Sequence, residues 1–443
     1  MDAFLQNIAV SLQKYGKVLL LTAANINQHL AAAGIDNFSE NPADDIKFNR
    51  WLEKKEQETD FILYQGNYSN DYWTQACIRQ ADKIMLVSDF YDFEKTDVEK
   101  LLLDDTKKLS YVSKSLVLLH PDGATPPSGT ARHLDIRDVD RHHHIRWSHP
   151  TDFQRLARFM IGKAVGLVLG GGGAKGFAHI GVIKRMEEAG IPIDFVGGTS
   201  IGAIICAGVA MDMDAATIHA QARNSFVIEK PLTDVTIPLI SYYSGQKLNR
   251  MLRKNLGEKD IEDQWINFFC VSSNLSKACP NIHRRGSFWK AVRASLSIPG
   301  ALPPVVSNGD LLVDGALMNN LPIDIMVDMG IGQVIGVDLS EEKKYKLDYE
   351  EVPTTFQLLK NKFSFRKKRL KVPSLMTIIS KSIVLASYEK AGAVEGLADW
   401  FIKPPVEKFK ILDFNNFDEI AELGYQYTDK LMRESPELAM KFS

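Results

Sequence analysis

A serine between two glycines, in the run Gly198-Thr199-Ser200-Ile201-Gly202, is the pattern with the clearest chemical meaning in this chain. It follows the apolar residues Phe195 and Val196, so it predicts a sharp turn from a buried strand into a helix that presents the serine hydroxyl. A serine hydroxyl is a weak nucleophile at neutral pH, so it needs a nearby base and N–H donors that stabilise an oxyanion. The pattern favours a serine hydrolase, and glycines that serve only packing are the alternative.

A glycine-rich loop offers the N–H donors. Val165–Leu169 predicts a buried strand, and Gly170-Gly171-Gly172-Gly173-Ala174-Lys175-Gly176 follows it and precedes a helix. Glycines let backbone N–H groups approach a ligand, and the helix start adds a positive dipole, so the loop suits an oxyanion or a phosphate. The loop also satisfies the G-x-G-x-x-G pattern of dinucleotide sites, which leaves anion binding by a catalytically silent α/β module as an alternative.

Two nucleotide-binding interpretations fit the surrounding residues poorly. In a dinucleotide fold an acidic residue caps the end of the second strand, whereas here that strand ends at the serine turn and Asp194 precedes it. Lys175-Gly176 reverses the Gly-Lys order of a P-loop, and no Ser or Thr follows. The hydrolase interpretation is therefore preferred.

Asp314 is the best candidate for an acidic base. Leu311–Val313 predicts a buried strand, and Asp314-Gly315 ends it at a turn, where a carboxylate could reach the edge of another strand. A turn-forming Asp-Gly pair is the alternative. The last histidine is His283, so with Asp314 as the acid the chain order Ser, Asp, His of α/β-hydrolases is impossible. A Ser-Asp dyad thus competes with a triad that recruits His179, His219 or His283.

The elements that must position these residues predict an α/β fold. In the first third of the chain, short β-rich runs alternate with helical stretches, which predicts a parallel sheet with helical crossovers. The runs are Val18–Leu21, Phe61–Tyr64, Ile84–Val87 and Leu116–Leu119. A second unit begins near Ala164 as strand, glycine loop, helix, strand, serine turn and helix, which places both turns at the carboxyl edge of a parallel sheet. Further strands are predicted at Phe268–Ser272, Leu311–Val313 and Gln333–Val337.

These patterns predict three regions. Residues 1–160 form an N-terminal α/β domain of unknown role, residues 161–340 a catalytic domain, and residues 341–443 a helical extension packed on the catalytic domain. The extension contains Lys360–Lys371, which carries seven basic residues around Phe363 and Phe365. This segment is interpreted either as a peripheral contact with anionic membrane or as a solvated basic loop.

Composition restricts the partners and the compartment. The 443-residue chain has a formal net charge of -2, which predicts no nucleic-acid partner, and four cysteines without paired spacing, which favours the cytoplasm. Neither a signal peptide nor an apolar run of about 20 residues is visible, so a soluble or peripheral membrane protein is expected. Strand alternation could align only two of His142, His143 and His144, so no metal site is expected.

Three motifs, taken together and in this order, resemble the signatures of patatin-like phospholipases: Gly171–Gly176, Gly198–Gly202 and Asp314-Gly315-Ala316. The closer likeness is to the neuropathy target esterase branch. It rests on longer matches through Gly190–Ser200, Ser297–Gly300 with Pro303-Pro304, Asp314–Pro322, Trp73–Asp82 and Gly424–Tyr427.

The resemblance implies a patatin-like three-layer α/β domain with a central, mostly parallel sheet, preceded by a smaller α/β domain. It implies Ser200 as nucleophile and Asp314 as base, without a histidine, and an oxyanion hole at Gly171, Gly172 and Gly173. Supporting motif positions are Lys175, Gly176, Gly198, Gly202 and Gly315. Family members hydrolyse acyl esters of phospholipids and lysophospholipids without metal or cofactor, commonly at cytoplasmic membrane faces.

Two departures from the family pattern are visible. Larger members of this branch carry cyclic-nucleotide-binding modules, and some a membrane anchor, ahead of the region seen here. Neither is visible, so the expectation is a short member or a fragment. Gly170 stands where plant patatins have Asp.

Overall fold

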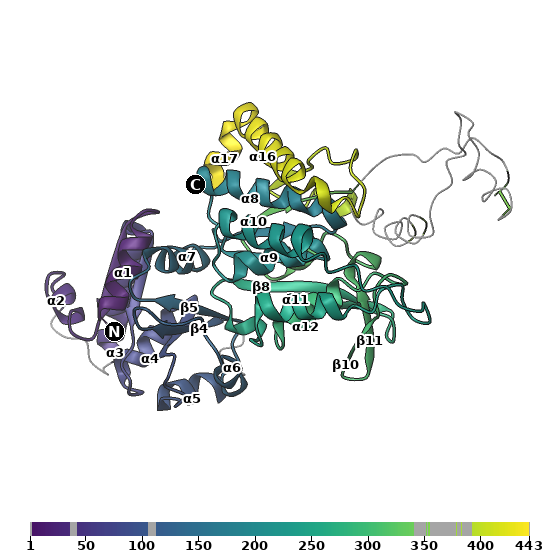
Figure 1. The fold of residues 1–443 in the computed structure, drawn as a ribbon. Coiled ribbons are helices and arrows are strands. Elements are labelled where there is room, and N and C mark those ends of the chain that lie inside the picture. Colours follow the sequence, from purple (N-terminus) through teal and green to yellow (C-terminus); the bar gives the residue numbers. More distant parts are fainter. Residues whose placement is uncertain are drawn as a thin grey trace.

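The computed structural model describes residues 2–35, 42–104, 112–340, 351, 353–354, 378, 382 and 392–442. Within these ranges the chain forms one eight-stranded sheet and two smaller sheets, each combined with helices (Figure 1). The two smaller sheets belong to residues 2–160, which we call the N-terminal unit. The predicted α/β class, with a mostly parallel central sheet after a smaller α/β region, is confirmed.

The N-terminal unit alternates strands and helices, as its sequence pattern predicts. Its elements are α1 (Asp2–Leu12), β1 (Val18–Thr22), α2 (Ile26–Ala31), α3 (Pro42–Glu58), β2 (Phe61–Gln65), α4 (Tyr72–Gln80), β3 (Lys83–Asp89), α5 (Asp97–Asp104), β4 (Ser113–His120), α6 (Ala131–Ile136), β5 (Arg141–Arg146) and α7 (Pro150–Met160). All pairings are parallel, but the strands form two sheets, β1-β2 and β3-β4-β5. The four predicted strands are confirmed.

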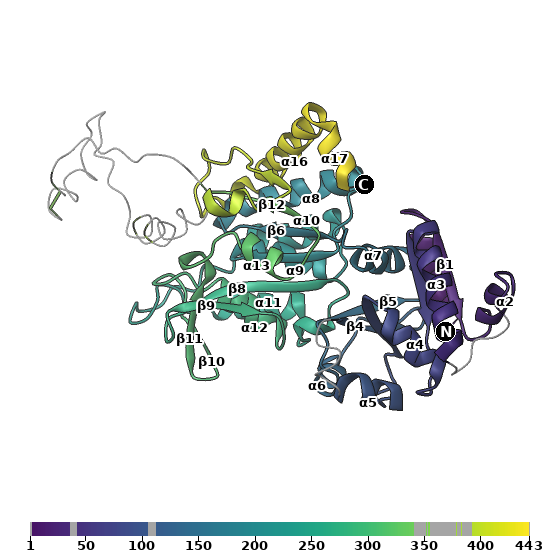
Figure 2. The same ribbon diagram turned by 180° about the vertical axis from the view of Figure 1, so that it is seen from behind.

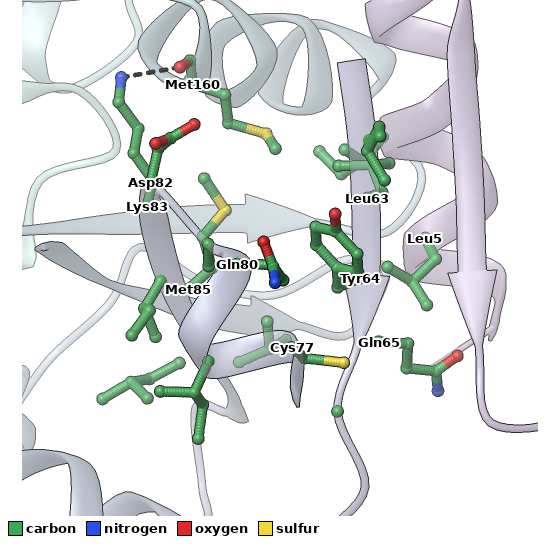
Figure 3. Close-up of a pocket in the computed structure, with 18 of the residues that line it drawn as sticks. Leu5, Leu63, Tyr64, Gln65, Cys77, Gln80, Asp82, Lys83, Met85 and Met160 are labelled. Atoms are coloured by element: carbon green, nitrogen blue, oxygen red, sulfur yellow. Dashed lines mark hydrogen bonds between the residues drawn. The ribbon is translucent and has the colours of Figure 1, made fainter. Parts of the chain in front are cut away.

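A cavity of about 700 Å³ lies between these two sheets. Strands β2 and β3 both line it, and apolar side chains such as Leu5, Leu63 and Met85 make much of its wall (Figure 3). Lys83 also lines this cavity, and its Nζ donates a hydrogen bond to the Met160 carbonyl oxygen at 2.7 Å.

The central sheet has the order β10-β11-β8-β7-β6-β12-β13, with β9 on the other edge of β8. Its strands are β6 (Val165–Leu169), β7 (Phe195–Thr199), β8 (Asn267–Asn274), β9 (Cys279–His283), β10 (Val305–Ser307), β11 (Asp310–Asp314), β12 (Gln333–Val337) and β13 (Trp400–Ile402). The run from β8 to β13 is parallel, and β9, β10 and β11 are antiparallel to their neighbours. The predicted strands of this region are confirmed.

Helices cover both faces of this sheet because its strands are apolar on both sides. On one face, residues such as Leu167 and Cys270 pack with a cluster that includes α8 (Ala178–Glu188), α9 (Ile201–Ala210), α10 (Ala215–Arg223), α11 (Gln246–Leu256) and α12 (Phe288–Ser295). On the other face, Val168 and Phe269 pack against α13 (Ile323–Asp328), which lies in front of the sheet in Figure 2.

The end of the chain joins this body in two ways. Strand β13 extends the central sheet beside β12, and α16 (Phe417–Glu434) packs along α8. The last helix is α17 (Pro436–Phe442). Five short helical turns complete the description: η1 (Gly173–Phe177), η2 (Asn224–Ile228), η3 (Ile261–Asp263), η4 (Gly315–Leu317) and η5 (Phe414–Asn416). The predicted basic segment Lys360–Lys371 lies outside the described residues.

Candidate active site

Ser200 occupies a strained turn between β7 and α9. Its backbone has φ 56° and ψ -126°, a conformation that non-glycine residues rarely adopt. The flanking glycines make this turn possible, because a Cβ at Gly202 would lie 2.1 Å from the Leu169 carbonyl oxygen and one at Gly198 would lie 2.8 Å from the Gly202 carbonyl carbon. The two glycines of the motif are therefore required by close backbone packing around the serine.

Asp314 reaches Ser200 because two strands meet end to end along one edge of β8. Thr199, the last residue of β7, pairs with Val271, and Asp314, the last residue of β11, pairs with the next residue, Ser272. Strand β9 pairs with this stretch of β8 as well, so it occupies the opposite edge, and β7 and β11 must share the other one. The serine turn and the carboxylate consequently emerge at neighbouring positions.

The two side chains are in direct contact. The Ser200 hydroxyl donates to Oδ2 of Asp314 at 2.8 Å, and the backbone N–H of Ala316 donates to Oδ1 at 2.8 Å. Both residues are buried. Burial raises the pKa of Asp314 to about 6, although these two hydrogen bonds favour its ionised form. A carboxylate with this pKa is ionised at neutral pH and can accept the proton of the hydroxyl.

The three histidines considered for a triad all bond elsewhere. His179 Nε2 donates to the Gly170 carbonyl oxygen at 2.9 Å, and burial lowers the pKa of His179 to about 4, so the ring is neutral. His219 lies 3.3 Å from the Asp418 carboxylate. His283 lies 2.8 Å from the Ser272 hydroxyl. The structure thus brings together Ser200 and Asp314 and places each histidine in another set of contacts.

The glycine loop lies directly against the serine turn. A Cβ at Gly171 would be 3.1 Å from the Ser200 Cβ, and one at Gly176 would be 2.2 Å from Cγ2 of Ile201. Gly173 has φ +59°, and a Cβ there would be 2.4 Å from the Ile411 carbonyl oxygen. Side chains at Gly171 and Gly176 would push the loop away from the serine turn, and one at Gly173 would collide with Ile411.

The N–H groups of this loop differ in their partners. The Gly171 N–H donates to the Asn320 carbonyl oxygen at 3.2 Å, and the Ala174 N–H donates to the Ile411 carbonyl oxygen at 2.8 Å. Within the described residues, neither Gly172 nor Gly173 has an acceptor for its N–H group. The loop thus contains two neighbouring backbone N–H groups without an acceptor in the described part of the chain.

The remaining motif residues support these contacts. Lys175 is buried in η1, immediately before α8. Gly315 follows Asp314, and a Cβ there would lie 2.2 Å from the Val271 carbonyl oxygen. The absence of a side chain at Gly315 therefore lets β11 end against β8 and β7.

Sequence reasoning missed two residues that position the site. The Ser200 N–H donates to Ser295 Oγ at 2.9 Å, and the Ser295 hydroxyl donates to the Val271 carbonyl oxygen at 2.7 Å. Asn320 accepts the Gly171 N–H through its backbone, and its side-chain Nδ2 donates to the Gly171 carbonyl oxygen at 3.3 Å. Asn320 lay within a quoted motif, whereas Ser295, at the end of α12, carried no signal of its own.

Asp194 and the His, Cys, Asp and Glu side chains bear on nucleotide and metal binding. Asp194, a candidate acid for dinucleotide binding, accepts hydrogen bonds from the Arg158 guanidinium at 2.6 and 2.8 Å and from the Val165 N–H at 2.9 Å. Its carboxylate therefore holds α7 and β6 together. In the described ranges, no three His, Cys, Asp or Glu side chains gather in a way that would hold a metal ion.

The run of three histidines lies in β5 of the N-terminal unit, where this unit contacts the residues before β8. His142 and His144 share one face of β5, and both rings bond to the Glu262 carbonyl oxygen, at 3.0 and 2.9 Å. His143 points to the other face, where its ring packs against Phe159. Strand alternation aligns two of the three, as predicted, and these two join β5 to the residues before β8.

Among the residues that the structure describes, no helix combines the length and the apolar character that crossing a bilayer requires.

Comparison with known proteins gives two family matches. Residues 167–327 match the patatin-like phospholipase family, and residues 1–158 match the Neuropathy Target Esterase family P-loop like domain. The first match contains Ser200, Asp314 and the glycine loop, and the second contains the N-terminal unit almost entirely.

Proteins from three different organisms are similar in sequence to this chain. The chain is 34% identical to Patatin-like phospholipase domain-containing protein 6 of Homo sapiens, 34% to Neuropathy target esterase sws of Drosophila melanogaster and 30% to Lysophospholipase NTE1 of Kluyveromyces lactis. Each alignment covers 96% of this chain but only 33%, 32% and 34%, respectively, of the relative. The chain therefore spans about one third of the length of these relatives.

Proposed function

We propose that this chain, which belongs to the patatin-like phospholipase family and to its neuropathy target esterase branch, hydrolyses acyl ester bonds of phospholipids and lysophospholipids. The observation that carries the proposal is the 2.8 Å hydrogen bond between the Ser200 hydroxyl and the Asp314 carboxylate. A buried hydroxyl that donates to a buried carboxylate at a strained turn is the arrangement expected of an activated nucleophile.

The reaction proceeds by acyl transfer in two stages. Asp314 accepts the Ser200 proton while Oγ attacks the ester carbonyl carbon, and the resulting oxyanion is held at the loop of Gly171, Gly172 and Gly173, whose second and third N–H groups are the available donors. The ester C–O bond then breaks, and the departing alcohol takes the proton from Asp314. Water attacks the acyl-serine with Asp314 again as base, which releases the fatty acid and restores Ser200.

Labelling by a fluorophosphonate probe, together with hydrolysis of a lysophosphatidylcholine, tests the nucleophile. Ser200→Ala should abolish labelling and lower turnover by about 10³-fold or more, because no other group forms the acyl intermediate. Ser225→Ala is a matched control, since Ser225 is buried and its hydroxyl accepts from Asn255 Nδ2 away from the site. Normal activity of a folded Ser200→Ala variant would overturn the proposal.

Histidine variants distinguish the dyad from a triad. His219→Ala and His283→Ala should each keep most of the turnover, because their rings contact Asp418 and Ser272 rather than the two proposed catalytic residues. A collapse of activity in either variant, with folding confirmed by circular dichroism, would show that a histidine serves as base.

We also propose a peripheral membrane location at the cytoplasmic face, with Lys360–Lys371 as one contact. Support comes from residue types alone: clustered Lys and Arg near an anionic surface contribute about 1 kcal/mol each. Removing the positive charges should weaken binding to phosphatidylserine vesicles and reduce its dependence on salt. Binding that ignores both anionic lipid and salt would contradict this contact.

A further inference from the structure

One exposed loop of the catalytic region consists almost entirely of apolar side chains. Residues 235–243, which we call the apolar loop, lie between η2 and α11 and contain no charged residue. Ile237, Leu239 and Ile240 at its tip are 78%, 89% and 73% exposed, and Val235 and Tyr242 at its sides are exposed too. Single exposed apolar residues are common on protein surfaces, but five within eight residues form a patch that indicates an interaction site.

Hydrogen bonds at the base of the loop hold this tip out. Val235 and Tyr243 form an antiparallel bridge, and the Thr236 N–H donates to the Tyr242 carbonyl oxygen at 3.0 Å. Just below, the Asp234 carboxylate accepts from the Ser244 hydroxyl at 2.6 Å and from the Lys247 N–H at 3.1 Å. The exposure of the tip is thus imposed by a closed, bonded base.

The base of the loop is also joined to the segment that holds Asp314. The Tyr242 N–H donates to the Gly300 carbonyl oxygen at 2.8 Å, and the Tyr243 N–H donates to that of Ala301 at 2.9 Å. Three residues before Gly300, the Ser297 carbonyl oxygen accepts the Asp314 N–H at 2.9 Å. The loop before α11 accordingly lies at the same end of the central sheet as the β10–β11 hairpin (Figure 1).

A buried arginine braces this connection. The Arg293 guanidinium donates to the Pro303 carbonyl oxygen at 3.1 Å and to Asn249 Oδ1 at 2.7 Å, and it also contacts the Ser297 hydroxyl. Arg293 therefore ties α11, which follows the apolar loop, to the turn at residues 297–303. The loop and the proposed site share one framework of hydrogen bonds.

Two lysines lie at the base rather than at the tip. Lys247 Nζ donates to Thr233 Oγ1 at 2.7 Å, and the Thr233 hydroxyl donates to the Lys230 carbonyl oxygen at 3.0 Å. Both lysines are exposed. Aliphatic side chains at a tip with cations set behind them match the layers of a bilayer surface, where acyl chains lie beneath phosphate groups.

We propose that the apolar loop inserts into the surface of a phospholipid bilayer and docks the proposed active site against it. This inference rests on the proposed function, which requires the ester of a membrane lipid to reach Ser200. Because the tip is uncharged and aliphatic, insertion should occur into zwitterionic lipid, whereas the contact proposed for Lys360–Lys371 requires anionic lipid.

Vesicle binding tests this proposal independently of catalysis. In a Ser200→Ala background, which cannot consume lipid, Ile237→Ser/Leu239→Ser/Ile240→Ser should weaken binding to phosphatidylcholine vesicles by about 30-fold or more, since three aliphatic side chains lose their apolar environment. The matched control is Val10→Ser/Ile46→Ser/Leu101→Ser, which removes three exposed apolar residues of the N-terminal unit. This control should bind vesicles as the parent does.

A site-specific label reports insertion directly. Cys279 is the only exposed cysteine in the described ranges, and Cys77, Cys206 and Cys270 are buried. Leu239→Cys in a Cys279→Ser background, labelled with a nitrobenzoxadiazole dye, should show a blue-shifted, brighter emission when phosphatidylcholine vesicles are added. The same label at Val10→Cys should not respond.

The outcomes separate the two proposals. With otherwise wild-type catalytic residues, the loop variant should lose activity on vesicle-borne lysophosphatidylcholine while it still hydrolyses a soluble p-nitrophenyl butyrate. A parent chain that hydrolyses neither substrate, but whose vesicle binding is weakened by the loop substitutions, would overturn the proposed function and leave the insertion. Unchanged vesicle binding, an unresponsive dye, or a loop that only mediates self-association of the chain would overturn the insertion.

Discussion

The two α/β regions of this protein differ in how closely atoms pack beside their parallel strands. In the N-terminal unit, β2 and β3 stay apart and line a cavity of about 700 Å³, whose Lys83 bonds to a backbone carbonyl (Figure 3). At the edge of the central sheet, glycines remove side-chain atoms so that backbone segments touch, and Ser200 meets Asp314 in the interior. The proposed chemistry therefore depends on close approach of buried polar groups, and open space alone does not supply it.

Of the substitutions considered, replacement of the buried Asp314 carboxylate should have the largest effect on turnover. Asp314→Asn should lower turnover by about 10³-fold or more, because the amide cannot accept the serine proton. The pKa of Asp314 is raised to about 6 from 3.8, so the folded state binds this proton more tightly than the unfolded state, and stability is lost as pH rises through that range. At pH 8 the variant should consequently unfold at higher denaturant concentration, with a gain of about 1 to 3 kcal/mol.

The pH dependence of the parent provides the control for this prediction. Its kcat/KM on a soluble ester should fall as pH drops below about 6, as Asp314 becomes protonated. A flat profile down to pH 4.5, or a less stable Asp314→Asn variant at pH 8, would contradict the assignment of a buried, ionised base.

The same Ala→Leu substitution in each region should change the free energy of unfolding by different amounts, depending on whether the site is closely packed or lies beside a cavity. Ala203→Leu, at a fully buried position of α9 beside the serine turn, should reduce the free energy of unfolding by about 1 to 3 kcal/mol because the new atoms have no room. Ala81→Leu, at the wall of the N-terminal cavity, should change it by less than about 1 kcal/mol. Urea denaturation measures both, and equal losses would show that the cavity does not accommodate the side chain.

A smaller effect on turnover than that of Asp314→Asn is expected at two buried hydroxyl groups that each accept a backbone N–H. Ser295 accepts the Ser200 N–H, and Thr74 in the N-terminal unit accepts the Asn67 N–H, both at 2.9 Å. Ser295→Ala should cost about 1 to 3 kcal/mol of stability, since the buried Ser200 N–H loses its acceptor. Thr74→Val should cost less, about 0.5 to 1.5 kcal/mol, because Asn67 is exposed and water can accept from its N–H. Only Ser295→Ala should also lower kcat, by about 10-fold at similar KM, because it loosens the backbone of Ser200, the proposed nucleophile. An equal loss of kcat in Thr74→Val would show that the effect of Ser295→Ala does not come from its contact with Ser200.

Much of the fold follows from local patterns. Apolar runs such as Val165–Leu169 and Gln333–Val337 predict buried strands, and both occur where expected because strands apolar on both faces require helices on each side. The separation of β2 from β3 could not be predicted, since strand pairing depends on which edges meet in space. The strand β13, only three residues long, likewise gains its identity from pairing with β12.

The candidate site divides in the same way. The glycines flanking Ser200 and the glycine loop are recognisable in the sequence, because tight turns restrict the residues that they accept. The hydrogen bonds that hold Gly171 depend on Asn320, which lies about 150 positions away in the chain, so local sequence does not reveal them. The contribution of Ser295 is invisible for the same reason.

By itself, the sequence determined the serine turn, the glycine loop and the absence of any histidine after His283, because each is a property of local residue type and order. Only the tertiary structure decided that Asp314 is the residue that accepts the hydrogen bond from the Ser200 hydroxyl. The physical reason is the register along β8, where Val271 and Ser272 pair with the ends of two strands more than 100 residues apart and bring the serine and the carboxylate together.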